Sequence, residues 1–553
     1  MKQNALLWTV KQIRRRIPAL GLLVLAQVGH SLFLVLFALG SRGVIDSAVA
    51  GDPTLFAQAC NQQALIIGGI LLCLTLARHL KEKLAADLER DWKQDLLRGL
   101  LHGDYAEVSA YHSAELLNRL NADVAKVNDG ILTILPGASA MVTRLGAAVI
   151  VLGALDLRFT LMAAALGLVV ICATGIMRRK LKDLNKQVSQ QDGKVSGYIQ
   201  ESMEKLLLIQ AMDISGEIEL RADQLLQDRY SLQRKRKNIA LLANSSVSIL
   251  RYGAGFLALW WCAGRLLEGQ MSFGSLTAVI QLVNQLQAPF VNLSGVFPKY
   301  MAMVASAERL QELDQIRQQQ APAAMDPQAL YQNIRSLRMK DLTFSYDREV
   351  IFRNASVTVP KGAFTVITGP SGVGKSTVLK LLLGIYRPES GTLELECGSG
   401  KHLLDRSTRR LFAYVPQGNL LFSGTIRENL TIACPDAAQS QLAQAISVSC
   451  MDAFLETLPL GLETMLGENG AGLSEGQAQR LAIARAVLSG APIVLLDECT
   501  SALDEATEAQ VLNNLKALTD RTCIAVTHRP AALALSDLHL EVRDGSIFAK
   551  ESK

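Results

Sequence analysis

Hydrophobic residues are distributed unevenly along this chain of 553 residues. Long apolar stretches occupy the N-terminal half, whereas the C-terminal half alternates short apolar runs with polar positions. A helix that crosses a bilayer needs roughly 20 predominantly apolar residues. The apolar stretches therefore predict an all-α transmembrane domain of six helices, of which the second and the last carry more polar residues: 17–39, 64–80, 132–155, 159–177, 246–267 and 273–297.

Basic residues mark one side of this domain. The sequence KQIRRR precedes the first span and RRKLK follows the fourth, whereas the connections on the opposite side are short or weakly charged. Cytoplasmic connections of membrane proteins are enriched in Lys and Arg, so we expect both termini to be cytoplasmic. A signal peptide also begins with basic residues, but the first apolar run is longer than a signal core and more spans follow. We therefore expect the first apolar run to be a membrane anchor and not a cleaved signal peptide.

The connections 81–131 and 178–245 contain few Gly or Pro residues and many charged ones. This composition predicts that spans two to five continue as helices beyond the bilayer. Each pair of helices then needs a turn, which we expect within 102–117 and 211–220. Residues 2–17 indicate an amphipathic helix at the cytoplasmic surface, in contact with membrane lipid.

Some polar side chains fall inside the predicted spans, where a charge in hydrocarbon is costly and usually faces a cavity or a partner. The clearest cases are Arg144 and Arg251, together with Gln281 and Gln285. Hydrogen bonds between helices, or side chains that reach toward the headgroups, would explain them. The alternative is a polar substrate pathway that favours an anionic group.

Composition supports a membrane protein, because 49% of the residues are hydrophobic and 19% are charged. A net charge of +5 is small for this length and does not indicate nucleic-acid binding. The nine cysteines occur singly, with no C-x-x-C pair, so neither a zinc site nor a disulfide framework is expected.

A polar, proline-containing segment separates the two halves of the chain. After it, short runs of β-branched residues alternate with helical patterns, which is typical of α/β domains. We therefore divide the chain into a transmembrane domain (1–315), a linker (316–330) and an α/β P-loop NTPase domain (331–553).

The strongest single motif of the second half is FTVITGPSGVGKST, in which a predicted strand at 364–367 leads into a glycine-rich loop and a helix. Glycines allow backbone N–H groups to close around phosphates, and the helix N-terminus adds its dipole. In such a loop Lys375 would contact the β- and γ-phosphates, and Ser376 would ligate Mg²⁺.

Two further predicted strands end in polar side chains. The run PIVLLDE (492–498) ends in Asp497 and Glu498, and TCIAVTH (522–528) ends in His528. A buried parallel strand would bring its carboxyl end beside the phosphate loop. There Asp497 suits Mg²⁺, Glu498 can act as a general base on water, and His528 can contact the γ-phosphate. Together these residues predict NTP hydrolysis by positioning and charge stabilisation.

With these motifs the sequence resembles the ATP-binding cassette (ABC) transporters, specifically exporter half-transporters with one membrane domain and one nucleotide domain. Gln417, in YVPQGNLLFSGTIRENL, resembles the Q-loop contact to Mg²⁺ and water, and SALD and THR resemble the D-loop and the switch histidine. Tyr346 matches the aromatic residue that stacks on adenine. LSEGQ resembles the signature motif, with Ser474, Gly476 and Gln477 at nucleotide-binding positions. GPSGVGKST resembles the Walker A loop: Gly369, Pro370, Ser371, Gly372, Val373, Gly374, Lys375, Ser376 and Thr377.

The resemblance implies a dimer with a second half-transporter, in which each ATP lies between one Walker A loop and the other chain's signature. A homodimer is favoured and a heterodimer stays open. The turns at 102–117 and 211–220 would be coupling helices, and the membrane would be a bacterial plasma (inner) membrane. The implied function is ATP-driven export of an amphipathic, lipid or peptide-like substrate. A gating or signalling ATPase without net transport, and an importer with an exporter fold, are the alternatives.

The signature contains an unusual carboxylate. Ser474 and Gln477 predict a Ser-x-x-Gln capping box, and Glu475 at the first helical position is favourable with the helix dipole. The family usually has glycine at position 475, where this helix end faces ATP held by the opposite subunit. Either Glu475 points away, or the signature is weakened and the chain pairs with a different subunit.

Overall fold

The computed structural model describes residues 2–316, 326–346, 349–398, 400–418, 421–467 and 470–550. Some helical side chains lie outside this description, namely those of 2–4, 163–182, 243–244, 246–247, 250–251, 287–295 and 297. The chain forms two compact units. The first consists of Met1–Gly99 and Ser113–Gln315, and the second of Leu100–His112 and Ile316–Lys553.

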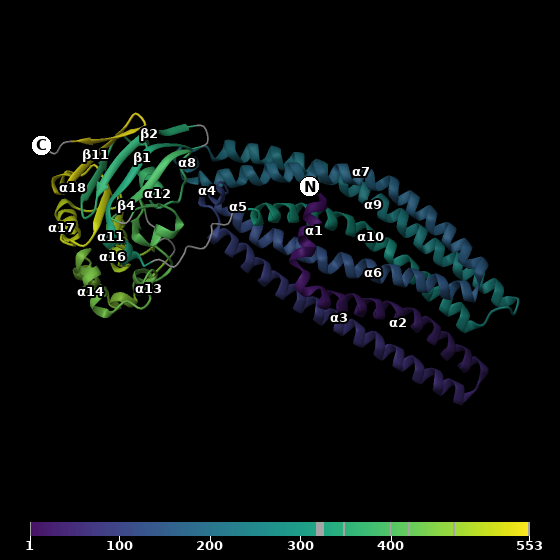
Figure 1. Ribbon diagram of the computed structural model, residues 1–553. Helices are drawn as coiled ribbons and strands as arrows, with labels where there is room; N and C mark the ends of the chain where they lie inside the picture. The colour runs from purple at the N-terminus through teal and green to yellow at the C-terminus, as the bar shows by residue number, and fades with distance from the viewer. Residues whose placement is uncertain are drawn as a thin grey trace. The chain divides into compact units, whose positions relative to one another are not determined.

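Long helices make up most of the first unit (Figure 1). Six of the helices in the described residues are longer than 30 residues: α2 (Ile17–Ala50), α3 (Pro53–His102), α6 (Val124–Leu155), α7 (Leu157–Glu204), α9 (Ser215–Leu267) and α10 (Phe273–Asp314). The shorter elements are α1 (Lys2–Gln12), η1 (Arg14–Arg16), α5 (Ser113–Asn118), a π-helical turn η2 (Arg119–Asp123) and α8 (Leu206–Ala211).

Local chemistry sets several of these helix ends. Gly51 ends α2 in the left-handed conformation (φ 67°), which glycine adopts without strain. The Asp156 carboxylate caps α7 by accepting hydrogen bonds from the backbone N–H groups of Arg158 and Phe159. The Ser272 hydroxyl caps α10 in the same way.

Each predicted span lies within one long helix, and α3, α6, α7 and α9 continue well beyond the predicted spans, as expected. Among the described residues, three helical stretches are long and apolar enough to cross a membrane: Arg14–Ala50, Pro53–His102 and Ser113–Leu155. The predicted spans in α7, α9 and α10 include side chains outside the described part.

Both predicted turns are confirmed. The helix α3 ends at His102 within 102–117, where short α4 (Tyr105–Ser109) follows. Within 211–220 the turn is short, because α8 ends at Ala211 and α9 begins at Ser215. The break lies at Met212–Ile214, where Asp213 adopts a left-handed conformation (φ 54°).

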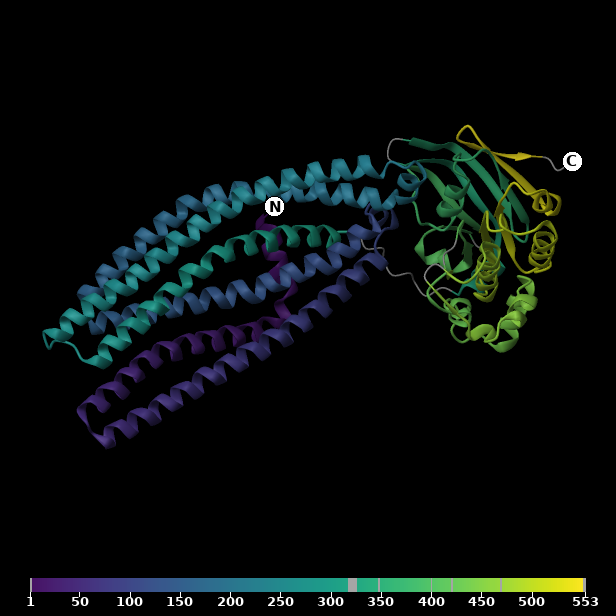
Figure 2. The same cartoon turned by 180° about the vertical axis from the view of Figure 1, so that it is seen from behind.

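Helix α10 is the central packing element of the first unit, since it contacts α2, α6, α9 and α1. A Cβ on Gly130 of α6 would lie 2.6 Å from the Met303 side chain of α10, so glycine permits the close approach of these helices. Helices α7 and α9 run side by side (Figure 2). Helix α1 also packs on protein, because Trp8 donates a hydrogen bond to Asp314 and contacts Trp92 edge-on.

The second unit contains two main sheets. A four-stranded antiparallel sheet has the order β2-β1-β4-β5, and a six-stranded sheet has the order β12-β11-β3-β10-β9-β6, parallel except for β12. Their strands are β1 (Ile334–Tyr346), β2 (Glu349–Pro360), β3 (Phe364–Thr368), β4 (Ser390–Cys397), β5 (Gly400–Leu403), β6 (Phe412–Val415), β9 (Ile493–Asp497), β10 (Thr522–Val526), β11 (Leu538–Arg543) and β12 (Ser546–Lys550). A two-stranded sheet pairs β7 (Gly424–Thr425) with β8 (Met465–Leu466).

Helices complete this unit: α11 (Pro327–Asn333), α12 (Lys375–Leu382), η3 (Arg406–Leu411), α13 (Ile426–Thr431), α14 (Gln439–Val448), α15 (Asp452–Thr457), η4 (Gly461–Glu463), α16 (Glu475–Leu488), α17 (Glu505–Lys516) and α18 (Pro530–Leu535).

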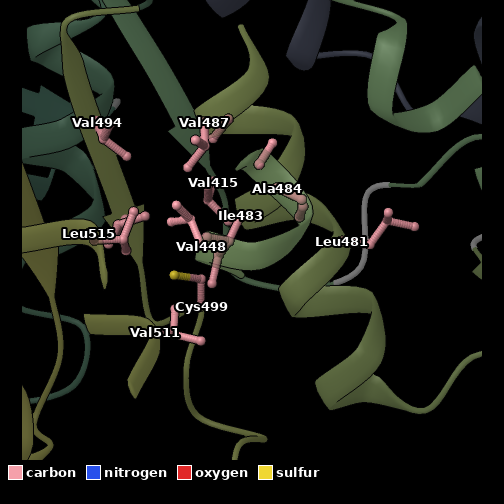
Figure 3. Packing of buried hydrophobic residues seen from close by; sticks show 14 of the residues in the cluster. Val415, Val448, Leu481, Ile483, Ala484, Val487, Val494, Cys499, Val511 and Leu515 are labelled. Atoms are coloured by element: carbon pink, nitrogen blue, oxygen red, sulfur yellow. The ribbon is translucent and has the colours of Figure 1, made fainter. Parts of the chain in front are cut away.

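The six-stranded sheet is buried on both faces because successive side chains of a strand alternate between them. Along β9, Val494 packs with residues of α14, α16 and α17 (Figure 3), and Leu496 belongs to the same apolar cluster, which α13 completes. Ile493 and Leu495 pack toward α12 and the antiparallel sheet. Every residue of β9 and β10 is buried. This double burial holds the carboxyl ends of the central strands rigidly at one edge of the sheet.

Candidate functional site

The glycine-rich loop leaves β3 and leads directly into α12. Gly369, Gly372 and Gly374 all have positive φ, at 147°, 79° and 106°. A Cβ on Gly369 would lie 2.4 Å from the Val542 carbonyl oxygen, and one on Gly374 the same distance from a side-chain carbon of β2. The loop conformation therefore requires glycine at these positions.

Lys375 begins α12 and is only 6% exposed. Its ammonium donates hydrogen bonds of 2.9 Å to the carbonyl oxygens of Gly369 and Pro370. The side chain thus folds back over the loop and places a positive charge at its centre. This position suits the binding of a phosphate group.

The next residue, Ser376, connects α12 with β9. Its hydroxyl donates a hydrogen bond of 2.8 Å to Oδ1 of Asp497, and Tyr414 donates one of 3.0 Å to Oδ2. Burial and the neighbouring carboxylate raise the pKa of Tyr414, so this residue stays a neutral donor. A hydroxyl and a buried carboxylate side by side fit Mg²⁺, which is bound by few protein oxygens together with phosphate and water.

Glu498 follows β9 and adopts a left-handed conformation (φ 49°), which is uncommon for a residue with a side chain. Its backbone N–H donates to the Val526 carbonyl, and its carboxylate accepts a 2.8 Å hydrogen bond from Gln417. His528 is exposed and lies two residues beyond β10, because the strand ends at Val526 and not at 528 as predicted. In the described part of the chain no hydrogen bond joins His528 to Glu498.

Tyr346 lies at the end of β1, where its ring contacts Phe344 and Tyr386 edge-on at centroid distances of 4.9 and 5.2 Å. Its hydroxyl is 3.3 Å from Oγ1 of Thr377, next to the phosphate loop. The sequence analysis did not identify Tyr386 or Tyr414 as site residues. Tyr386 follows the apolar run after the phosphate loop, and Tyr414 lies within the apolar run before Gln417.

The signature helix α16 begins as predicted. Ser474 and Gln477 form a reciprocal capping box, with hydrogen bonds of 3.3 and 2.8 Å, and Glu475 is exposed at the first helical position. A Cβ on Gly476 would lie 2.8 Å from the Ala502 carbonyl oxygen. Gln479, which sequence reasoning missed, also joins α16 to this turn, through its hydrogen bonds to 501 and 502.

The structure therefore brings Lys375, Ser376, Asp497, Gln417 and Glu498 to one edge of the sheet. Among the described residues, no hydrogen bond or ring contact joins the signature residues Ser474, Gly476 and Gln477 to the phosphate loop. Within one chain the two groups of predicted nucleotide contacts are separate.

The polar residues of the first unit have different surroundings. Gln285 donates a hydrogen bond of 2.7 Å to the Leu34 carbonyl of α2, which is an interhelical contact. Nε of Arg144 and Oε1 of Gln281 are buried and have no hydrogen-bond partner among the described residues. The side chain of Arg251 lies outside the described part of the structure.

A unit of long apolar helices followed by a P-loop domain with catalytic-type carboxylates defines a membrane-bound nucleoside triphosphatase. Two family models match the chain: the ABC transporter transmembrane region over residues 19–290, and the ABC transporter model over residues 352–501. The chain belongs to the ABC transporters. It is an integral membrane protein with an ATP-binding domain that hydrolyses ATP.

Known proteins of similar sequence are ABC transporters. YfiC of Bacillus subtilis, an uncharacterized ABC transporter ATP-binding protein, is 26% identical over 92% of this chain and 87% of its own length. The mitochondrial iron-sulfur clusters transporter ATM1 of Yarrowia lipolytica is 35% identical over 52% of this chain and 40% of its own. A solved structure of a bacterial Atm1-family ABC exporter with ATP bound has a TM-score of 0.78 and 24% identity, and the match covers 98% of this chain and 95% of that one.

Proposed function

We propose that this chain is one half of a dimeric exporter that uses ATP hydrolysis to move an amphipathic, lipid or peptide-like substrate out of the cytoplasm. The observation that carries the proposal is the pair of hydrogen bonds Ser376–Asp497 and Gln417–Glu498 at one edge of the sheet. These bonds support the proposal, because they join a hydroxyl–carboxylate pair suited to Mg²⁺ and an amide–carboxylate pair suited to activating water at the same edge of the sheet.

Each residue then has a defined task. Lys375 binds the β- and γ-phosphates, and Ser376 and Asp497 hold Mg²⁺, which when bound neutralises phosphate charge. Gln417 contributes an amide to the same cation and to the attacking water. Glu498 accepts a proton from that water.

Two more residues contact the nucleotide in this proposal. Tyr346 stacks on adenine, and His528, exposed beyond β10, contacts the γ-phosphate. The rest of the phosphate loop from Gly369 to Thr377 wraps the phosphates with its backbone N–H groups.

The separation of the signature residues from the phosphate loop supports a dimer. In the dimer the signature of this chain, Ser474, Gly476 and Gln477, would contact ATP bound to the second half-transporter. The signature of the second half-transporter would contact ATP bound to this chain. A homodimer is the simpler assembly, because this chain carries both halves of the site. A heterodimer is the alternative if Glu475 weakens the signature.

The proposed organisation is a transmembrane domain at 1–315, a linker at 316–330 and a nucleotide domain at 331–553. In this proposal both termini lie on the cytoplasmic side of a bacterial inner membrane, because the connections on the side of the termini are rich in Lys and Arg.

An anionic substrate group is proposed to bind along α6 and α10. The segments 17–45, 53–81, 130–155, 157–182, 229–267 and 269–307 contain no Asp or Glu. The buried Nε of Arg144 has no partner among the described residues, so a counter-charge from the substrate would offset the desolvation of this guanidinium. Gln281 adds an acceptor without a hydrogen-bond partner among the described residues, while Gln285 is already bonded to α2. Arg251 is proposed for the same pathway because it lies within a predicted span.

Transport in membrane vesicles tests the proposed function. Inverted vesicles that contain the chain should accumulate solute with ATP, and vesicles with Glu498→Gln should not. Hydrolysis that never moves a solute would favour the gating ATPase, and movement in the opposite direction would favour the importer. For the substrate class, native mass spectrometry of the Glu498→Gln protein should find co-purified anionic molecules that Arg144→Gln releases and Arg144→Lys retains.

A further inference from the structure

The short helix α4 belongs to the nucleotide unit, although only two residues separate it from the end of α3, most of which belongs to the helical unit. Asp104 caps α4 by accepting a hydrogen bond of 3.0 Å from the Ala106 N–H. The first residue of α4, Tyr105, contacts the ring of Tyr386 edge-on, with a centroid distance of 5.8 Å and an interplanar angle of 80°. The segment that follows α3 in the chain therefore packs on an aromatic ring of the nucleotide unit.

Tyr386 makes a second perpendicular contact, to Tyr346. Those two rings are 5.2 Å apart at 87°, and Tyr386 also contacts Phe344 at 5.6 Å. Burial and the neighbouring tyrosines raise the pKa of Tyr386 to about 12, while Ser109 of α4 hydrogen bonds to its hydroxyl. Tyr386 is thus held on one side by α4 and on the other by the predicted adenine-stacking residue.

The contacts continue to the phosphate loop. The hydroxyl of Tyr346 is 3.3 Å from Oγ1 of Thr377 in α12. Tyr346 and α4 also line the same open hollow of about 480 Å³, with Asp104, Glu107 and Arg387 at its edge. A base stacked on Tyr346 from this hollow would lie beside α4.

We propose that the base of ATP is sensed by α4 through the aromatic relay Tyr346–Tyr386–Tyr105, in which Tyr386 and Tyr105 are positioning residues. Edge-to-face rings in a packed cluster cannot turn one at a time without losing their contacts. A base that fixes the Tyr346 ring therefore fixes Tyr386, and Tyr386 fixes the start of α4. This route reports the base and is separate from the Gln417–Glu498 pair, which we propose acts on the attacking water. It rests on the proposed stacking of adenine on Tyr346.

Hydrogen exchange of the full-length chain in lipid nanodiscs tests the relay. A Glu498→Gln background prevents turnover, and magnesium tripolyphosphate serves as a probe that has phosphates and no base. Both ATP and tripolyphosphate should protect backbone amides of 369–377, but only ATP should protect 104–112, by at least about threefold in exchange rate. Equal protection of 104–112 by saturating tripolyphosphate would overturn the relay.

Variants of the middle ring sharpen the test. Tyr386→Leu should lose the ATP-dependent protection of 104–112 while keeping that of 369–377, and Tyr386→Phe should retain both. Tyr331→Leu is the matched control, because Tyr331 is a buried tyrosine of the same unit whose hydroxyl bonds to Thr522, outside the relay. Wild-type protection of 104–112 in Tyr386→Leu would contradict the proposal.

Two further variants separate the possible failures. If Tyr386→Leu does not fold, Tyr105→Leu replaces a ring that is 48% exposed and should give the same loss. Tyr346→Leu should weaken binding of ATP and leave binding of tripolyphosphate unchanged. If ATP affinity does not change in Tyr346→Leu, adenine does not stack on Tyr346. If only the relay is wrong, Tyr346→Leu still weakens ATP binding.

Discussion

Nε2 of Gln417 donates a hydrogen bond of 2.8 Å to Oε2 of Glu498. The bond joins the segment after β6 to the residue after β9, and these two strands are neighbours in the parallel sheet. A displacement of either segment would therefore reorient the carboxylate that we propose as general base. The amide also holds that carboxylate in one orientation.

Replacement of this carboxylate should stop turnover and leave binding intact. In Glu498→Gln the amide cannot accept a proton from water, so the ATPase rate should fall at least about a hundredfold, with ATP affinity nearly unchanged. Steady-state ATPase assays and nucleotide binding to the purified chain measure the two effects. Glu505→Gln, at the exposed start of α17, is the control and should retain the wild-type rate. Full turnover by Glu498→Gln would assign the base elsewhere.

The signature carboxylate should have little influence on the rate. Glu475 is exposed at the start of α16, so we expect Glu475→Gly to change the ATPase rate of the chain expressed alone by less than about threefold. If the carboxylate instead lay ~4 Å from the γ-phosphate of ATP, the repulsion would be about 4 kcal/mol per unit charge at an effective dielectric near 20. ATP affinity would then fall roughly a thousandfold. A chain that is silent alone and active with glycine would establish the weakened signature and a different partner subunit.

The close packing of Gly476 predicts a steric effect. Gly476→Ala would place Cβ 2.8 Å from the Ala502 carbonyl oxygen, so α16 and the turn at 501–504 must move apart. We expect the ATPase rate to fall about tenfold, because small displacements of positioned groups are expensive in catalysis. ATP binding to the isolated chain should be unaffected, since the phosphate loop is not touched. Gly398→Ala, where the added Cβ meets open space, should match wild type.

An ion pair between a buried carboxylate and a partly exposed arginine predicts how the stability of the helical unit depends on pH. Asp123 is 1% exposed and accepts hydrogen bonds from Arg309 and Ser306 of α10. Burial opposes ionisation of Asp123, but Arg309 and Ser306 outweigh it and hold the pKa of this carboxyl below its usual value. The pair therefore contributes stability that is present above the unfolded-state pKa near 4 and is lost as pH falls through the folded-state pKa.

Asp123→Asn removes the negative charge that pairs with Arg309, whose side chain is 41% exposed, and should destabilise the protein by about 1.5 kcal/mol near neutral pH. Thermal unfolding followed by tryptophan fluorescence should show a lower midpoint at pH 7, and the gap to wild type should close in acid. Asp95→Asn removes an exposed carboxylate that pairs with Arg98 and serves as the control. A gap between Asp123→Asn and wild type that does not depend on pH would contradict the ionic origin.

Much of this architecture follows from sequence, because its determinants are local. Apolar stretches of membrane length occur inside the long helices α2, α3 and α6, and continuous apolar runs gave the buried strands β9 and β10. The capping box of Ser474 and Gln477 was also predictable, since both partners lie within one helical turn. The turn after α8 was predicted only to within 211–220, because no Gly or Pro marks its residues Met212–Ile214.

The sequence by itself determined the class of protein and the chemistry of the phosphate loop, because glycine spacing and strand ends act over a few residues. Only the tertiary structure decided which side chains meet across the fold. Tyr386 lies 281 residues from Tyr105 in the chain, and no periodic pattern links them; their contact exists because α4 packs on the cassette. The exposure of Glu475 and the close approach of Gly476 to Ala502 likewise depend on how α16 packs on the turn at 501–504. Side-chain volumes and the order of strands in the sheet determine that packing.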